Sequence, residues 1–221
     1  ISRLYRIIEN TRKKDKLVGK PTKFVAIVGI AGTTETGNVD DLEELAGVSR
    51  EIGAHFHVDA AWGGGALIMD AEREMMKGIE QADTVSLDAH KLLFAPNSMG
   101  VCLFRNTRDS KLLYHTSNYI IRKGSIDQGR FTIEGSRPFA SLKPWAALKV
   151  LGKNGYKLIF AHAKKLQDTF VNLIERDPLF ELMNRPQLYI INYRFVPEEL
   201  KARLDILMEN PKKNSSEITA L

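Results

Sequence analysis

The sequence has very little cysteine and no long hydrophobic run, and both absences narrow the class of protein. Cys102 is the single cysteine among 221 residues, so no disulfide can form within the chain. It lies in the apolar run 101–104, which predicts a buried thiol. The longest apolar stretch, 24–31, is far shorter than the roughly 20 residues that span a bilayer, and the charged start does not resemble a signal peptide. We therefore expect a protein of the reducing cytoplasm with no membrane contact.

The chain also lacks the features of a nucleic-acid-binding surface. Its net charge is +5, but the tightest basic cluster, residues 12–16, contains no aromatic residue and no recognisable motif. That cluster predicts a solvated turn. With 43% hydrophobic and 27% charged residues, the composition is that of a globular protein with one large domain or two modest ones. The chain does not begin with methionine and ends in a polar tail at 210–221, which indicates a piece of a longer protein.

Alternating strand and helix patterns predict an α/β fold in the first two thirds of the chain. Residues 24–30 are a β-branched apolar run, typical of a strand covered on both faces. A strand followed by a helix and another strand predicts a parallel sheet. The predicted elements are a helix and a lysine-rich turn within 1–20, strands at 24–30, 55–59, 84–87 and 100–104, a helix capped by Asp40 that runs to Arg50, and a helix at 71–78.

The pattern changes after residue 141, which indicates a second structural unit. Helices are predicted at 142–151 and 156–176, followed by strands at 180–183 and 188–195. We place a domain boundary near Gly152 and Gly155, so that residues 1–153 belong to a large domain and residues 154–221 begin a small α+β domain.

Polar segments follow three of the predicted strands, at 32–34, 59–65 and 88–91. Ligands of open α/β sheets bind at the carboxyl ends of the strands. Asp59 is followed by two alanines and a glycine run, which would let a planar ligand approach the backbone. A buried carboxylate needs a cation or hydrogen-bond donors. Either a cationic ligand or backbone amides would satisfy Asp59.

Lys91 lies 32 residues after Asp59 and just beyond the strand at 84–87. An apolar run at 92–96 follows it and predicts a dry pocket around the amine. Desolvation favours the neutral amine, which is the form that attacks a carbonyl to make a Schiff base.

Two strings of residues carry a resemblance to a known family. His-Val-Asp-Ala-Ala-Trp-Gly-Gly at 57–64 and Ala-Asp-Thr-Val-Ser-Leu-Asp-Ala-His-Lys at 82–91 resemble the group II pyridoxal-phosphate-dependent decarboxylases. That family includes glutamate, aromatic amino-acid, diaminobutyrate and cysteine-sulfinate decarboxylases. The resemblance extends from about residue 24 to 197. Segments 119–123 and 134–137 are most similar to bacterial glutamate decarboxylase-like and pyridoxal-dependent aspartate 1-decarboxylase members.

The resemblance implies an aspartate aminotransferase-like (fold type I) architecture, with a mostly parallel sheet between helices, and a role for each matching residue. Lys91 would hold pyridoxal 5′-phosphate as a Schiff base, and Asp59 would pair with its pyridine nitrogen. Ala61 would lie against one face of the ring, His90 near the phosphate, and Thr33 in the pocket near the cofactor. Decarboxylation of an amino acid would then pass through a quinonoid intermediate. A homodimer is also implied, because active sites of the family lie at subunit interfaces.

The chain departs from the family pattern in two respects. The family's ring-stacking histidine and serine-rich phosphate-binding turn lie farther upstream than the residues present here. The family's mobile loop, expected at 125–132, contains no tyrosine in this sequence, so the group that returns a proton to the substrate is unassigned. The alternatives are another lyase or a transaminase of the same fold, and an inactive truncated module for scaffolding or dimerisation.

Two further expectations concern the substrate and metals. An acidic substrate, glutamate or aspartate, would need an arginine for its side-chain carboxylate, and Arg130, Arg137 and Arg194 are the candidates. His55 and His57 alternate on a strand, but no third ligand has a suitable spacing, so the sequence predicts no metal site.

Overall fold

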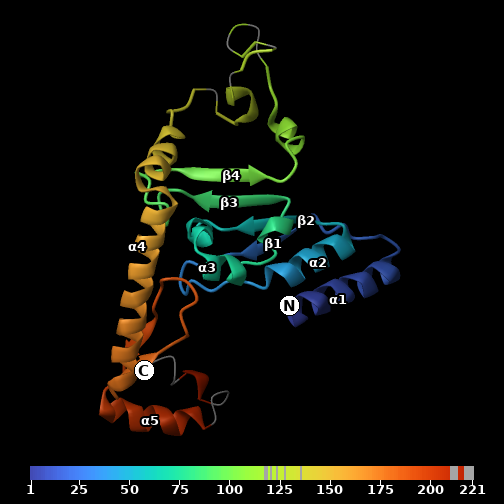
Figure 1. Ribbon diagram of the computed structural model, residues 1–221. Helices are drawn as coiled ribbons and strands as arrows, with labels where there is room; N and C mark the ends of the chain where they lie inside the picture. The colour runs from blue at the N-terminus through green and yellow to red at the C-terminus, as the bar shows by residue number, and fades with distance from the viewer. Residues whose placement is uncertain are drawn as a thin grey trace.

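A four-stranded sheet forms the centre of the computed structural model (Figure 1). Strands β1 (Ala26–Ile30), β2 (His55–Asp59) and β3 (Thr84–Asp88) run parallel, and β4 (Gly100–Phe104) pairs antiparallel with β3. The structure describes residues 1–116, 119, 121–122, 124–126, 128–134, 136–209 and 214–216. The predicted α/β fold with a mostly parallel sheet is confirmed.

Helices flank this sheet, and a smaller sheet lies near the end of the chain. Figure 1 shows α4 running past one end of the strands towards β5, β6 and α5. The helices are α1 (Ser2–Val18), α2 (Leu42–Ile52), α3 (Asp70–Met75), α4 (Leu142–Arg176) and α5 (Glu198–Met208), with 3-10 turns η1 (Gly63–Ile68), η2 (Ile79–Gln81), η3 (Asp109–Leu113) and η4 (Gln128–Phe131). Strands β5 (Phe180–Leu182) and β6 (Tyr193–Phe195) form an antiparallel pair.

Within the described part of the chain, one face of the central sheet is packed and the other is open. Helix α2 lies so close to β1 that a Cβ built on Gly29 would be 2.8 Å from a methyl group of Leu42. On the opposite face Val28 is 55% exposed, and Cys102 of β4 is exposed as well. The predictions of a strand covered on both faces and of a buried Cys102 are therefore wrong for this chain.

The basic cluster at 12–16 lies within α1 and does not form the predicted turn. The charged side chains of this cluster face solvent, so they do not oppose helix formation. Two of them form ion pairs: Lys13 with Glu9 at 2.7 Å, and Arg12 with Glu51 at 3.2 Å. The turn comes later, where the Asp15 carboxylate accepts hydrogen bonds from the backbone and hydroxyl of Thr22.

The predicted cap of α2 is wrong by one residue. The carboxylate of Asp41 accepts from the amide of Glu44 at 2.9 Å, the usual geometry of a helix N-cap. Asp40 instead accepts from the amide of Ile30 at 2.8 Å, so its carboxylate holds the loop against the end of β1.

The two helices predicted at 142–151 and 156–176 form one kinked element, α4. The kink is at Gly152, whose φ of 59° and ψ of 176° are outside the helical region. A residue without a Cβ adopts this conformation at little cost. The predicted domain boundary after residue 153 lies next to this kink and stays a prediction.

The strand predicted at 188–195 is much shorter than expected. Residues 188–191 leave the small sheet, and the segment docks on the large one, where Leu188 is 1% exposed within the core. Gln187 accepts from the amide of Val39 at 2.6 Å, and Asn192 donates to the carbonyl of Glu35 at 2.9 Å. Packing against loops distant in sequence thus replaces strand pairing here.

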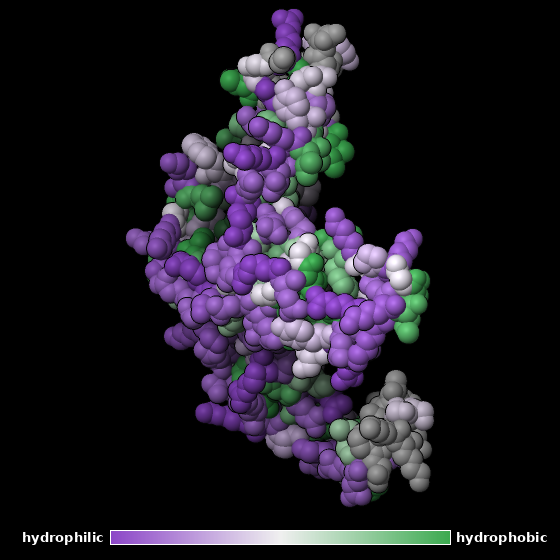
Figure 2. Space-filling view, turned by 90° about the vertical axis from the view of Figure 1, so that its right-hand side faces the viewer, coloured by the Kyte–Doolittle hydropathy of each residue, from purple (hydrophilic) through white to green (hydrophobic). Residues whose placement is uncertain are grey.

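The face of the molecule drawn in Figure 2 is mainly hydrophilic, with separate patches of apolar side chains. Among the described residues, no helix has the length and apolar character needed to cross a bilayer. Ile120, Lys123, Asp127 and Gly135, which belong to segments used in the resemblance, lie outside the described residues, as does most of the tail at 210–221.

Candidate active site

The carboxyl ends of β1, β2 and β3 meet at one edge of the sheet, because these strands are parallel. Ile30 pairs with Asp59, and Asp59 pairs with Ser86. Backbone hydrogen bonds continue the pairing just beyond the strand ends. The amide of Ala31 donates to the carbonyl of Asp59, and the amide of Ala60 donates to the carbonyl of Ser86, both at 2.8 Å. The segments that follow the three strands are therefore neighbours, as the sequence predicted.

Asp59 is held by donors on one of its two carboxylate oxygens. The amide of Ala61 lies 3.0 Å from Oδ1, and the hydroxyl of Ser86 lies 3.2 Å from the same atom. Among the described residues, Oδ2 accepts no hydrogen bond. One oxygen of Asp59 is thus fixed, and the other is available to a donor from a ligand.

A short series of contacts joins Asp59 to Lys91 through Ala61. The amide of Ala61 donates to Asp59, and its carbonyl accepts from the amide of Asp88 at 3.3 Å. Asp88 Oδ2 lies 3.1 Å from Lys91 Nζ. The carboxylate and the amine that the sequence singled out therefore project from adjoining loops.

Lys91 lies in an ion pair and not in the predicted dry pocket. Its side chain is 33% exposed, and that of Asp88 is 27% exposed. The apolar run after Lys91 turns away from the amine: Leu92 is buried in the core. The desolvation that we expected from the sequence is replaced by a carboxylate partner.

Asp88 makes a contact in this site that sequence analysis missed. Its carboxylate oxygen Oδ2 lies 3.9 Å from His90 Nε2 but only 3.1 Å from Lys91 Nζ. A signal was present in the sequence, because an acid three residues before a lysine in a tight turn can reach it.

The loop that carries Lys91 is held by the long helix α4. The hydroxyl of Tyr156 donates to the carbonyl of Leu93 at 2.7 Å, and Lys143 Nζ donates to the carbonyl of Asn97 at 2.8 Å. Phe94 has a φ of 54°, a left-handed conformation that is unusual for a bulky residue and reverses the chain three residues after Lys91. The lysine is thus presented on a tightly turned, anchored loop.

His90 is anchored by the loop between β3 and β4. Its Nδ1 lies 3.0 Å from the amide of Met99 and 2.9 Å from the carbonyl of the same residue. When Nδ1 accepts from the Met99 amide, the ring proton is on Nε2, on the side of Asp88. His90 therefore lies beside Asp88, and its predicted position near a phosphate stays a prediction.

Thr33 uses its hydroxyl within its own loop. Oγ1 is 2.6 Å from the hydroxyl of Thr36 and accepts from the amide of Asn38 at 3.1 Å. These bonds shape the turn that follows β1, two residues after Ala31. The structure places Thr33 near the edge of the sheet, and contact of its side chain with a cofactor stays a prediction.

The glycine run after Asp59 serves packing within the chain. A Cβ on Gly63 would lie 2.4 Å from the carbonyl of Ala31, and one on Gly64 would lie 2.8 Å from Leu87. A Cβ on Gly65 would lie 2.8 Å from the backbone of Leu92. These glycines let η1 pack against the turn after β1, β3 and the loop of Lys91, and their expected role in admitting a planar ligand stays a prediction.

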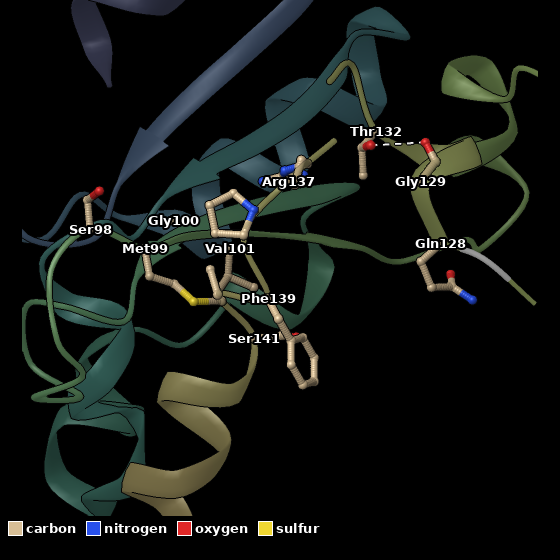
Figure 3. Close-up of a pocket in the computed structure, with 12 residues that line it drawn as sticks. Ser98, Met99, Gly100, Val101, Gln128, Gly129, Thr132, Arg137, Phe139 and Ser141 are labelled. Carbon is tan, nitrogen blue, oxygen red and sulfur yellow. Dashed lines mark hydrogen bonds between the residues drawn. The ribbon is translucent and has the colours of Figure 1, made fainter. Parts of the chain in front are cut away.

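A pocket of about 530 Å³ opens beside the start of β4 (Figure 3). It is lined on one side by residues 98–101, which include the Met99 that anchors His90, and on the other by parts of 128–141. Arg137 lines it and pairs with Glu134 at 3.3 Å. Of the three candidate arginines, Arg194 is paired with Glu181 on the small sheet, and Arg130 lies over the ring of Phe131.

The two histidines of β2 take part in hydrogen bonds with β3. Both rings bond to the hydroxyl of Thr84, each at 2.8 Å. In the part of the chain that the structure describes, no three histidine, cysteine, aspartate or glutamate side chains come together as metal ligands.

Comparison with known proteins decides the family of this chain. Residues 3–196 match the model of the pyridoxal-dependent decarboxylase conserved domain. The chain belongs to this family. Over 193 residues it is 42% identical to an aspartate 1-decarboxylase of Aliivibrio fischeri, a match that covers 87% of this chain and 35% of that protein. It is 34% identical to an aromatic-L-amino-acid decarboxylase of Bacillus atrophaeus, with 94% of this chain and 44% of the relative covered.

Solved structures of decarboxylases share the fold. The crystal structure of mouse CSAD superposes with a TM-score of 0.79 at 26% identity, over 96% of this chain and 44% of the other. The chain thus spans less than half the length of these relatives. The predicted family and its fold are confirmed.

The residues at the sheet edge fit the cofactor of the family, pyridoxal phosphate. Its aldehyde needs a primary amine, and its pyridine nitrogen is stabilised in the protonated form by a carboxylate. Lys91 would supply the amine, and Asp59 would offer Oδ2, because its Oδ1 is held by Ala61 and Ser86. Both groups have the required chemistry and lie on adjoining loops.

Proposed function

We propose that this chain carries the cofactor-binding core of a pyridoxal-phosphate-dependent amino-acid decarboxylase, in which Lys91 binds the cofactor covalently and Asp59 binds its ring nitrogen. The observation that carries the proposal is the series of contacts from Asp59 through Ala61 and Asp88 to Lys91. An amine and a carboxylate on neighbouring strand ends can bind opposite sides of one small aromatic aldehyde. Residues 1–153 would form part of the large domain and residues 154–221 the start of the small one.

Each group has a distinct task in this proposal. When bound, pyridoxal phosphate supplies a conjugated ring that accepts the electron pair left on the substrate carbon as carbon dioxide departs. Asp59 Oδ2 holds the proton on the ring nitrogen, and the Ala61 amide keeps the carboxylate in position. Asp88 would orient the amine of Lys91 towards the aldehyde of the cofactor. Ala61 would lie against the ring, with His90 on the phosphate side and Thr33 at the pocket edge.

We further propose an acidic amino acid as the substrate. The similar proteins include the aspartate 1-decarboxylase of Aliivibrio fischeri and a probable L-aspartate decarboxylase of Pyrococcus furiosus, which is 36% identical. The position of Arg137 also supports the proposal. It is the candidate arginine that lines the pocket beside the Met99–His90 contact. A guanidinium there would bind a side-chain carboxylate.

The attachment of the cofactor is tested on the purified whole protein. Borohydride reduction after addition of pyridoxal phosphate should give a stable adduct, and mass spectrometry should locate it on the peptide that contains Lys91. Lys91→Ala should abolish the adduct, whereas Lys77→Ala, which removes an exposed lysine paired with Glu43, should leave it unchanged. An adduct on another lysine, or its persistence in Lys91→Ala, would contradict the proposal.

The reaction and the substrate are tested by product analysis. Aspartate and glutamate should release carbon dioxide and the corresponding amine faster than aromatic amino acids do. Formation of a keto acid without carbon dioxide would instead indicate a transaminase of the same fold. A homodimer in the cytoplasm is part of the proposal and follows from the family resemblance. Light scattering of the whole protein at known concentration tests the dimer.

A further inference from the structure

A row of polar side chains crosses the open face of the central sheet and ends at Asp59. His55, His57 and Asp59 alternate along β2, so their side chains project from the same face. Thr84 and Ser86 of β3 are the strand partners of His57 and Asp59. Five polar groups from two strands are thus placed side by side, away from the face that α2 covers.

Hydrogen bonds connect these five side chains in one unbranched series. His55 Nε2 lies 2.8 Å from Thr84 Oγ1, which lies 2.8 Å from His57 Nδ1. His57 Nε2 lies 3.3 Å from Ser86 Oγ, and Ser86 Oγ lies 3.2 Å from Asp59 Oδ1. Both ring nitrogens of His57 are therefore used, one towards each hydroxyl.

The carboxylate fixes the direction of the whole series. A carboxylate can only accept hydrogen bonds, so the single hydroxyl proton of Ser86 points to Asp59. Ser86 must then accept from His57 Nε2–H. In a neutral His57 ring Nδ1 accepts from the hydroxyl of Thr84, which in turn accepts from His55 Nε2–H. Asp83 Oδ2 lies 3.8 Å from His55 Nδ1, at the far end of the series.

This arrangement determines which oxygen of Asp59 faces the ligand. Ser86 and the Ala61 amide both donate to Oδ1, and Oδ2 accepts no hydrogen bond among the described residues. Without Ser86 one of these two restraints is lost, and without the Nε2–H of His57 the Ser86 hydroxyl is no longer held in the orientation that donates to Asp59. The carboxylate is then free to rotate about its χ2 torsion, which is broad and has no strong preference of its own.

We propose that His57 and Ser86 are positioning residues, which hold the Asp59 carboxylate so that Oδ2 is presented to the ring nitrogen of the cofactor. The inference rests on the proposed function, because it concerns the same ligand. It adds that the open face of the sheet contributes to the chemistry through a directed series of hydrogen bonds, and that His57 acts as the tautomer with its proton on Nε2. Hydrogen-bonded neighbours that orient a ligand-binding group in this way are common around reactive sites.

The test uses the whole protein with bound pyridoxal phosphate labelled with 15N in the ring. The variants are Ser86→Ala and His57→Phe, which remove the donor, and Ser86→Thr and His57→Gln, which keep one. Val28→Ala is the matched control, because Val28 is the strand partner of His57 on β1, is 55% exposed and makes no polar side-chain contact. Asp59→Asn serves as the reference for loss of the charged partner. The readouts are the 15N chemical shift of the ring nitrogen and the cofactor dissociation constant.

We expect Ser86→Ala and His57→Phe to move the 15N signal towards that of Asp59→Asn. Each should also weaken cofactor binding about fivefold, the effect of losing one hydrogen bond worth about 1 kcal/mol. Ser86→Thr, His57→Gln and Val28→Ala should stay within about twofold of the parent protein. A merely structural role would not restore the 15N signal in the conservative variants, so this rescue separates positioning from folding. If His57→Phe does not fold, the two Ser86 variants decide the question.

The outcomes separate this inference from the function on which it rests. If Asp59→Asn shifts the 15N signal but Ser86→Ala and His57→Phe do not, the positioning role is overturned and the proposed function stands. If Asp59→Asn itself leaves the signal unchanged, the carboxylate does not bind the ring nitrogen and the proposed function fails with it.

Discussion

The loop that carries Lys91 should loosen when one distant hydroxyl group is removed. Tyr156 is completely buried, and its hydroxyl donates to the carbonyl of Leu93 at 2.7 Å. Tyr156→Phe keeps the ring, which stacks on Phe160 with a centroid distance of 6.4 Å, and removes only this donor. The lost hydrogen bond and the carbonyl left without a partner together cost about 1 to 2 kcal/mol. This free energy is lost at Leu93, two residues after Lys91. The loop should therefore open about tenfold more often.

Hydrogen–deuterium exchange of the cofactor-free whole protein measures this opening. The amide of Ala95, which donates to the carbonyl of Ala89 across the loop at 3.0 Å, should exchange about tenfold faster in Tyr156→Phe. Tyr193→Phe is the control, because Tyr193 contacts its neighbours through its ring and donates no hydrogen bond from its hydroxyl among the described residues. Equal exchange in Tyr156→Phe and the parent protein would show that α4 does not restrain the loop, and the reasoning would be refuted.

Two further substitutions probe the packing around this site. Burial, together with the hydrogen bond to Glu72 at 2.8 Å, raises the pKa of Tyr189 well above its ordinary value, so its contribution to stability is complete below about pH 10 and is lost as the pH rises further. The free energy of unfolding should therefore fall by up to about 1.4 kcal/mol per pH unit above pH 10. Tyr189→Phe should lower the free energy of unfolding by about 1.5 to 3 kcal/mol at pH 7 and should remove this loss of stability above pH 10. If urea denaturation shows the same drop in stability from pH 7 to pH 11 in both proteins, the argument is contradicted. Gly63→Ala should destabilise by about 1 to 3 kcal/mol, because its Cβ would lie 2.4 Å from the carbonyl of Ala31, whereas Gly47→Ala in α2 meets no atom within 4 Å and should be neutral or stabilising. Thermal unfolding compares the two glycine variants, and equal losses would refute the packing argument.

The central sheet could be predicted from the sequence because its strands are short apolar runs separated by clear turn residues. Strand β2 (His55–Asp59) was predicted with its bounds, and β3 (Thr84–Asp88) to within one residue. Details set by tertiary contacts could not be predicted. Asp40 and Asp41 are equally good caps by type, and only the end of β1 at Ile30 decides which of them binds the loop.

The small sheet shows the same limit of local patterns. The apolar alternation at 188–195 predicts a strand, yet only β6 (Tyr193–Phe195) pairs with a neighbour. Leu188 is drawn into the core of the large sheet instead, where it approaches Gly32 and Gly63. No local signal reveals this choice, because the competing partners are more than a hundred residues away along the chain.

The residue types of the candidate site could be predicted, but the contacts among them could not. A carboxylate and a lysine at strand ends predicted Asp59 and Lys91, and the family match supports that interpretation. The ion pair of Lys91 with Asp88 and the use of Ser86 on Asp59 depend on side-chain directions at the ends of two paired strands. Such contacts follow from register, which a sequence specifies only indirectly.

The glycine run after Asp59 shows how the fold and the site depend on the same residues. These three glycines are required by contacts with Ala31, Leu87 and Leu92, each closer than a Cβ would permit. Those contacts press η1 against the turn after β1, against β3 and against the loop of Lys91. A larger residue in the run would therefore separate the very loops that bring the amine to the carboxylate. The glycine run thus fixes how closely the loops after β1, β2 and β3 approach one another.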